Sequence, residues 1–235
     1  MRIAKTLADP KYRLRADAHD LTIEEEKNAS KLEAFAAEQK PDFPFLHSLA
    51  AFRLWAILET TADDLVLERL REDQDLWRKP IFMSIEGSLV QFTFALPTEQ
   101  TEMLVTRLKQ KLGAPLKIGV GRFEALFEAV DIAGEVADLP RKVLLELSEV
   151  RNVTAHKNAR ADARFLERCP WYEINKGETV RVTHPDFVRY KTAAHWYLVE
   201  LFRRLAVSSS EQQRMLELRE FLHNRLSELK IHPVH

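Results

Sequence analysis

The sequence predicts an all-α fold, and three observations support that prediction. Glycine is scarce, with 6 residues in 235, whereas a turn-rich β-sandwich would need more. Leu, Ala, Glu, Arg and Lys fill much of the chain, and most of these residues favour helices. Apolar residues also recur at helical spacing through most of the sequence. From the length we expect a charged extension at residues 1–43 and a helical domain at residues 44–235.

The first expected elements follow from apolar spacing and end signals. Residues 22–39 open like a capping box and carry a thin apolar stripe, which predicts a helix within the extension. Residues 45–77 have the spacing of one long helix or two shorter ones. Residues 80–96 fit either half of a β-hairpin or a buried helix with proline in its first turn, and the spacing favours the helix. A short amphipathic helix is expected at residues 98–112.

The middle of the chain is expected to continue with helices. The glycine-rich run at residues 113–121 lacks the Gly-Lys-Ser/Thr ending of a phosphate-binding P-loop, so we interpret it as a connector. Residues 122–137 and 140–150 each place apolar side chains on one face, which predicts two helices. The second of them leads directly to Arg151.

The last third alternates helices with one irregular segment. A short helix is expected at residues 161–168, and the proline that follows ends it. Two β-rich runs flank a glycine at residues 172–183, which predicts a small β-hairpin. Residues 187–205 and 210–229 are expected to form the two closing helices, the second capped by serine.

Charge and cysteine content narrow the classes of function. The net charge of −1 argues against a protein that coats nucleic acid through bulk electrostatics. Residues 141–204 nevertheless hold 13 Lys and Arg against 8 Asp and Glu, an excess for which a solvated helical face is the simpler explanation. Cys169 is the only cysteine, so no internal disulfide or multi-cysteine zinc site can form. The polar N-terminus and the lack of a long apolar stretch predict a cytoplasmic protein outside membranes, and no cofactor or metal is expected.

The strongest candidates for catalytic residues are Arg151, Asn152 and His156, which fall within one hexapeptide. Imidazole can take a proton from an RNA 2′-hydroxyl near neutral pH, and guanidinium can stabilise the charge that develops on the phosphate. The Arg-to-His spacing alone is weak evidence, because Arg189 with His195 and Arg225 with His232 have similar spacing. On an ideal helix Arg151 and His156 lie about 140° apart. A site built from both therefore needs a distorted helix or a second protomer.

The order of features around the hexapeptide resembles the HEPN ribonucleases. These features are Arg151-Asn152-Val153-Thr154-Ala155-His156 after an amphipathic helix, then Asp162, Arg164-Phe165, Cys169-Pro170, a hairpin-like flap and another long helix. The resemblance covers roughly residues 121–205 and extends less clearly back to residue 44. It implies a four-helix bundle and a metal-independent endoribonuclease, often a toxin or antiviral effector. It also implies a homodimer whose two motifs face one another, with Arg151, Asn152 and His156 as the catalytic residues.

Nearby basic and aromatic residues are candidates for RNA contacts. Lys157, Arg160 and Arg164 follow the motif and are candidate phosphate-binding residues, although solvated surface charges are the more common outcome. Trp171 and Tyr172 could stack a base, but aromatic residues after a Cys-Pro break more often fill the core.

Two other functions remain open from the sequence. One is a non-catalytic HEPN-like module that binds nucleotide or RNA, or that regulates a partner such as an antitoxin or a nucleotidyltransferase. The other is a helical scaffold in which the helix at residues 22–39 and the last helix dock partners.

Overall fold

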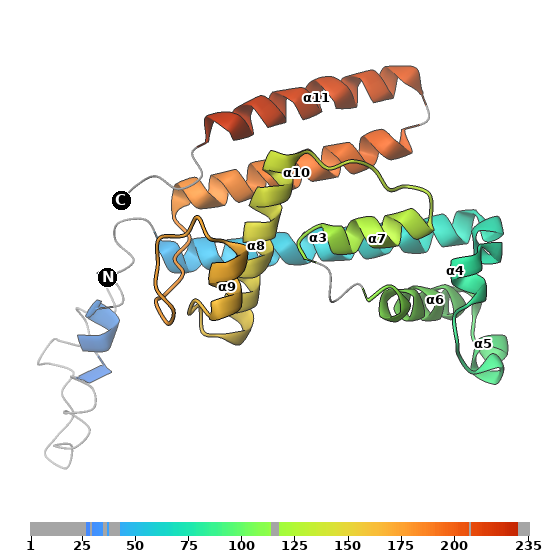
Figure 1. The fold of residues 1–235 in the computed structure, drawn as a ribbon, viewed down its shortest axis with the longest axis horizontal. Helices are drawn as coiled ribbons and strands as arrows, with labels where there is room; N and C mark the ends of the chain where they lie inside the picture. Colours follow the sequence, from blue (N-terminus) through green and yellow to red (C-terminus); the bar gives the residue numbers. More distant parts are fainter. Residues whose placement is uncertain are drawn as a thin grey trace, which may run out of the picture.

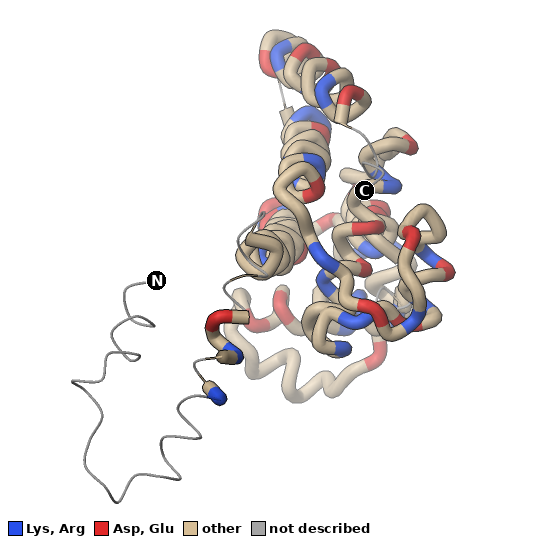
Figure 2. Tube along the Cα trace, turned by 90° about the vertical axis from the view of Figure 1, so that its left-hand side faces the viewer, with Lys and Arg blue, Asp and Glu red and all other residues tan. Residues whose placement is uncertain are grey.

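The computed structural model describes residues 27–28, 30–34, 37, 43–113, 118–206 and 208–229. These residues are mostly helical and include no strand, which confirms the all-α class. Its three longest helices, α3 (Pro44–Glu72), α10 (His184–Leu205) and α11 (Ser209–Glu228), lie one above another (Figure 1). Figure 2 views them nearly end-on, with charges of both signs interspersed along the chain. The fourth long helix, α8 (Asp138–His156), packs across α3 and α10.

Shorter helices surround this framework. At the far end of α3 the chain forms the 3₁₀ helix η2 (Gln74–Arg78), then α4 (Pro80–Met83), α5 (Leu89–Phe94) and α6 (Pro97–Lys111) (Figure 1). The chain then returns along α3 as α7 (Gly121–Ala129). After α8, the short helix α9 (Ala163–Arg168) packs against α8. The sequence thus brings α3, α7, α8 and α9 together at one side of the framework.

Local signals fix the ends of the long helices. Pro44 occupies the first turn of α3, where its missing N–H has no intrahelical acceptor to lose. Thr183 and Asp186 form a capping box at the start of α10. Ser208 and Glu211 form another at the start of α11, which confirms the expected serine cap.

The long helices share one apolar core. Its largest fully buried side chains are Trp55, Trp196, Tyr190, Tyr197, Phe127 and Phe165. Trp55 of α3 stacks on Phe123 of α7, and Phe123 stacks in turn on Tyr197 of α10. This continuous packing fixes α7 and α3 against each other, so side chains near their contact have defined positions.

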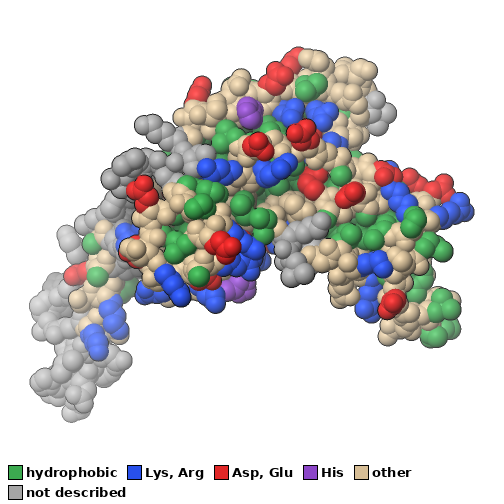
Figure 3. Space-filling model, viewed as in Figure 1, with side chains coloured by type: hydrophobic (Ala, Val, Ile, Leu, Met, Phe, Trp, Pro, Cys, Tyr) green, Lys and Arg blue, Asp and Glu red, His purple; other side chains and the backbone are tan. Residues whose placement is uncertain are grey.

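The prediction of one buried helix at residues 80–96 is wrong. Two short helices, α4 and α5, form instead, separated by an irregular segment around Gly87. The hydroxyl of Ser88 accepts a hydrogen bond from the Gln91 N–H and starts a new helix there. Phe82 is buried, but Leu89 and Leu96 of the same regular spacing are 78% and 63% exposed, so the spacing does not mark one continuous buried face. Figure 3 shows this apolar surface at the end of the molecule that holds α5.

The expected hairpin at residues 172–183 is absent, because no strand forms there. The segment pairs instead with the turn after α8, through one bridge between Arg160 and Thr179. The N–H of Val180 donates to the Ala159 carbonyl at 2.7 Å, and the N–H of Ala161 donates to the Glu178 carbonyl at 2.9 Å. The β-rich residues therefore pair with a segment before α9 rather than with each other.

The helix expected at residues 122–137 is shorter than predicted. α7 ends at Ala129, and Asp131 adopts a left-handed conformation with φ of 59°. The chain after it is irregular up to α8, and it passes close to Arg204, since a Cβ at Gly134 would lie 2.6 Å from Nε of that arginine. Of the helix expected at residues 22–39, residues 27–28, 30–34 and 37 are helical and exposed where described, and the rest lies outside the described residues.

Candidate functional site

The final turn of α8 carries the hexapeptide. The apolar face of this helix, with Val143, Leu147, Val150 and Val153, is buried in the core. The helix ends at His156, and the chain then reverses through Asn158 and Ala159, both with positive φ. The Ala159 N–H donates to the Val153 carbonyl at 2.9 Å, which stabilises this reversal. His156 is consequently exposed at the end of a rigid helix.

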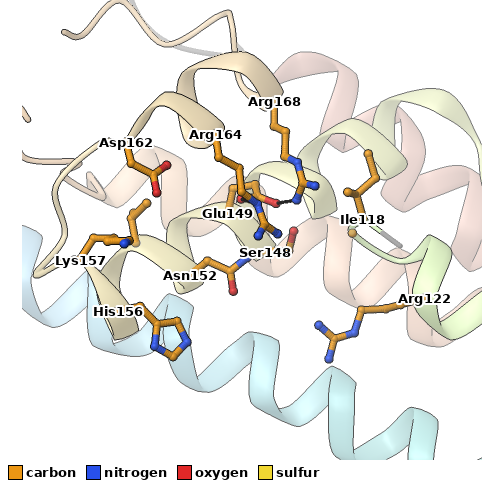
Figure 4. Close-up of a pocket in the computed structure, with 12 residues that line it drawn as sticks. Ile118, Arg122, Ser148, Glu149, Asn152, His156, Lys157, Asp162, Arg164 and Arg168 are labelled. Atoms are coloured by element: carbon orange, nitrogen blue, oxygen red, sulfur yellow. Dashed lines mark hydrogen bonds and ion pairs between the residues drawn. The ribbon is translucent and has the colours of Figure 1, made fainter. Parts of the chain in front are cut away.

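A cavity of about 280 Å³ lies beside this helix end (Figure 4). Three parts of the chain form it: the segment that leads into α7, the second half of α8, and the segment that includes α9. Its lining residues are Ile118, Gly119, Arg122, Ser148, Glu149, Asn152, Val153, His156, Lys157, Asp162, Arg164 and Arg168. Most of these side chains are polar or charged, so the cavity suits a small polar ligand rather than an apolar one.

The two carboxylates of the cavity are already engaged. Glu149 is almost fully buried and its Oε1 accepts a hydrogen bond from Nη1 of Arg168 at 2.6 Å. Its Oε2 lies 3.7 Å from Nε of Arg164. Asp162 caps α9 by accepting a hydrogen bond from the Phe165 N–H at 2.8 Å.

Two basic side chains that line the cavity remain available to a ligand. Lys157 and His156 are exposed, and neither side chain makes a hydrogen bond or an ion pair with any described residue. In Figure 4 the imidazole of His156 and the guanidinium of Arg122 point toward each other above α3. Figure 3 shows Lys and Arg side chains gathered beside a histidine at the edge of the molecule where α8 and α9 lie. The balance of unpaired groups therefore favours an anionic ligand.

Arg151 lies outside this cavity, although it belongs to the same motif as His156. Its Nη2 is 3.5 Å from Oε2 of Glu59, and its guanidinium lies 5.6 Å from the ring centroid of Phe52, both on α3. Its Nη1 donates to Oδ1 of Asn152 at 3.3 Å. Since α8 remains helical through both positions, Arg151 and His156 face different neighbours. One chain alone does not bring them together.

Two arginines of the cavity, Arg122 and Arg168, were not among the sequence candidates. Arg122 forms an ion pair with Glu59 of α3. It is the second residue of α7 and directly follows a glycine-rich segment, and that position is the one sequence signal that could have drawn attention to it. Arg168 closes α9 and carries no signal of its own, because its role depends on the tertiary contact with Glu149.

The three candidate RNA-binding residues separate in the structure. Lys157 and Arg164 line the cavity. Arg160 does not, and its Nη1 donates to the Gly177 carbonyl at 2.9 Å. It stabilises the segment that replaces the expected hairpin.

The aromatic candidates pack inward. Nε1 of Trp171 donates to Oε2 of Glu146 at 2.6 Å, and the Tyr172 hydroxyl lies 3.0 Å from that of Tyr190. Neither ring lines the cavity, so the interpretation of these residues as core packing agrees with their positions.

The remaining Arg/His pairs have no comparable setting. Arg189 is buried and bound to Glu146, whereas His195 is exposed on α10. Arg225 lies on α11, and His232 falls outside the described residues.

Cys169 is buried, and burial together with the nearby Glu146 and Glu149 carboxylates raises the pKa of its thiol. A thiol kept protonated in this way is a poor nucleophile. Among the described residues, no three His, Cys, Asp or Glu side chains are placed to share a metal ion. No described helix has the length and apolar character required to cross a bilayer.

Comparisons with protein families, curated proteins and solved structures find no match for this chain. An exposed imidazole, a neutral amide and several cations around a polar cavity can bind a phosphodiester and move a proton beside it.

Proposed function

We propose that the protein is a metal-independent endoribonuclease that cleaves RNA at the cavity beside His156. The observation that carries this proposal is the position of His156, which lines the same cavity as Asn152, Lys157 and three arginines. In the proposed setting the enzyme acts in the cytoplasm as a toxin or antiviral-defence effector with a HEPN-like bundle.

The proposed reaction is an internal transesterification. His156 accepts the proton of a 2′-hydroxyl, and the 2′-oxygen forms a bond to the adjacent phosphorus while the bond to the 5′-oxygen breaks. A protonated group or water supplies the proton that the 5′-oxygen needs. The products are a 2′,3′-cyclic phosphate and a 5′-hydroxyl.

The cationic groups stabilise the transition state in this scheme. The attacked phosphate gains negative charge, which guanidinium and ammonium groups held nearby offset. Lys157 and Arg164 line the cavity and are suited to adjoining phosphates. Asn152 orients the phosphate through its amide.

We further propose that the enzyme works as a homodimer in which Arg151 of one copy acts with His156 of the other. The separate environments of Arg151 and His156 within one chain support this arrangement, because a two-fold axis brings the same helix end of both copies together.

An alternative function is a non-catalytic module that binds RNA or nucleotide, or that regulates an antitoxin or a nucleotidyltransferase. The engagement of Arg151 by Glu59 and Phe52 favours it, since this arginine is then a structural contact. Incubation of single-stranded RNA with the purified protein in buffer containing a chelator separates the two: the enzyme yields fragments with cyclic phosphate ends, and the module leaves the RNA intact.

A further inference from the structure

Among the described residues, Glu59 is the one carboxylate that pairs both with Arg151 of the motif and with an arginine that lines the cavity. Its side chain, on α3, is 21% exposed and lies between two guanidinium groups. Oε1 pairs with Arg122, which lines the cavity, and Oε2 lies 3.5 Å from Nη2 of Arg151 in the motif. An anion thus already occupies the position between two arginines in the free protein.

Arg122 is held in a position suited to ligand binding. Its guanidinium lies 5.8 Å from the ring centroid of Trp55 and 5.5 Å from that of Phe123, so the aromatic core supports one face of it. About a third of its side chain remains exposed. Such support limits the conformations of the side chain, so less entropy is lost when a ligand binds.

A carboxylate and a phosphate compete for the same guanidinium edge. A planar carboxylate and a tetrahedral phosphate each present two oxygens that can accept two parallel N–H bonds from arginine. The distance between the carboxylate of Glu59 and each arginine is already that of an ion pair, so a phosphate that enters the cavity must share or displace it.

We propose that Arg122 binds a backbone phosphate of single-stranded RNA and that Glu59 competes with that phosphate for Arg122. The choice of RNA as the ligand rests on the proposed ribonuclease function. The contact itself is a separate claim, because binding can be measured without cleavage.

The test uses binding of a fluorescent 2′-O-methyl oligouridine, which has the backbone charge of RNA but no free 2′-hydroxyl to react. The full-length protein is titrated at several salt concentrations. Arg122→Gln keeps a polar side chain of similar type and removes the charged guanidinium that lies over Trp55. We expect it to weaken binding about five- to tenfold and to reduce the salt slope by about 0.7, the value for one phosphate contact on a single strand. Arg122→Lys is expected to restore most of that slope.

Glu59→Gln is expected to act in the opposite direction. It removes the competing charge and nearly preserves the side-chain shape, so affinity should rise about two- to fivefold. Arg78→Gln is the matched control, because Arg78 pairs only with Asp75 among the described residues and is 83% exposed on η2, outside the cavity. Thermal melting confirms that each variant is folded.

The outcomes distinguish three claims: phosphate binding by Arg122, competition by Glu59, and cleavage of RNA. If Arg122→Gln binds the oligonucleotide as Arg78→Gln does, Arg122 does not bind phosphate and the inference fails. If Glu59→Gln binds more weakly than wild type, Glu59 orients the arginine and does not compete. If the expected binding changes occur but wild type leaves ordinary RNA intact, this inference stands and the ribonuclease function is contradicted.

Discussion

Glu146 of α8 and Arg189 of α10 form an ion pair in the interior, with 2.5 Å between Oε1 and Nη2 and side chains that are 0% and 1% exposed. The same carboxylate also accepts hydrogen bonds from Tyr190 at 2.6 Å and from Trp171 at 2.6 Å. A buried charge needs such partners, because its desolvation is otherwise unfavourable. This network fixes α8 against α10 and so sets the position of the helix that ends in His156.

Glu146→Ala should therefore destabilise the fold strongly. The substitution leaves the guanidinium of Arg189 buried, with Asp186 as its one remaining carboxylate partner among the described residues. Loss of one partner from a buried pair costs about 3–5 kcal/mol, and urea denaturation would show this loss as a lower free energy of unfolding. Glu68→Ala is the control, because Glu68 forms an exposed pair with Arg71 and should cost less than about 1 kcal/mol. Equal effects of the two substitutions would contradict the role assigned to the network.

The buried tyrosines predict a loss of stability in alkali. Burial raises the pKa of Tyr190 and of Tyr197, with further contributions from nearby Tyr172 and Glu124 respectively. The folded protein thus keeps these phenols neutral, whereas the unfolded chain ionises them above about pH 10. The free energy of unfolding should stay unaffected by these groups below that pH and fall as the pH rises beyond it.

The measurement combines urea denaturation with ultraviolet absorbance of tyrosinate across this pH range. Tyr197→Phe loses the hydrogen bond to Glu124 at all pH values and should show a smaller alkaline decline. Ionisation of Tyr190 and Tyr197 in protein that is still folded would refute the prediction.

Local sequence signals were sufficient for most helices, but they failed at residues 80–96 and 172–183 and overestimated the length of α7. Periodicity and caps work where one face is buried, as in α10 and α11, because apolar spacing and core contact then coincide. At residues 80–96 the spacing is regular, but Ser88 starts a new helix in which Leu89 and Phe94 are exposed. At residues 172–183 the β-rich residues do form backbone hydrogen bonds, but their partner is the turn around Ala161, earlier in the sequence, and not the other half of a hairpin.

The same limit applies to the site. The helical angle between Arg151 and His156 already indicated that the two would diverge, and their contacts in the structure diverge accordingly. The identity of their neighbours could not be predicted, because Glu59, Arg122 and Arg168 reach the site through tertiary packing of α3, α7 and α9. Residues far apart in the sequence carry no spacing signal.

Lys157 and Arg160 are close in sequence but should differ in their effect on RNA binding. Lys157 lines the cavity without a partner among the described residues, so Lys157→Ala should weaken binding of the 2′-O-methyl oligouridine about two- to fivefold. Arg160 lies outside the cavity and holds the Gly177 carbonyl, so Arg160→Ala should bind normally. A larger loss from Arg160→Ala than from Lys157→Ala would place the RNA elsewhere.

A site shared between two copies predicts complementation. Arg151→Ala and His156→Ala should each be inactive alone, since each lacks one group of both shared sites. When the two variants are mixed and allowed to exchange subunits, one site of each mixed dimer regains both groups, and cleavage should return. Light scattering establishes the dimer independently. Mixed dimers that stay inactive would contradict the shared site.

The central claim is that His156 cleaves RNA without a metal ion, and one assay tests it most directly. Single-stranded RNA is incubated in chelator-containing buffer with wild type, His156→Ala or His195→Ala, the last an exposed histidine outside the cavity. Wild type and His195→Ala should yield fragments with 2′,3′-cyclic phosphate and 5′-hydroxyl ends, and His156→Ala should be about 10²- to 10⁴-fold slower. Intact RNA with the wild-type protein, or equal cleavage by His156→Ala, would contradict the claim.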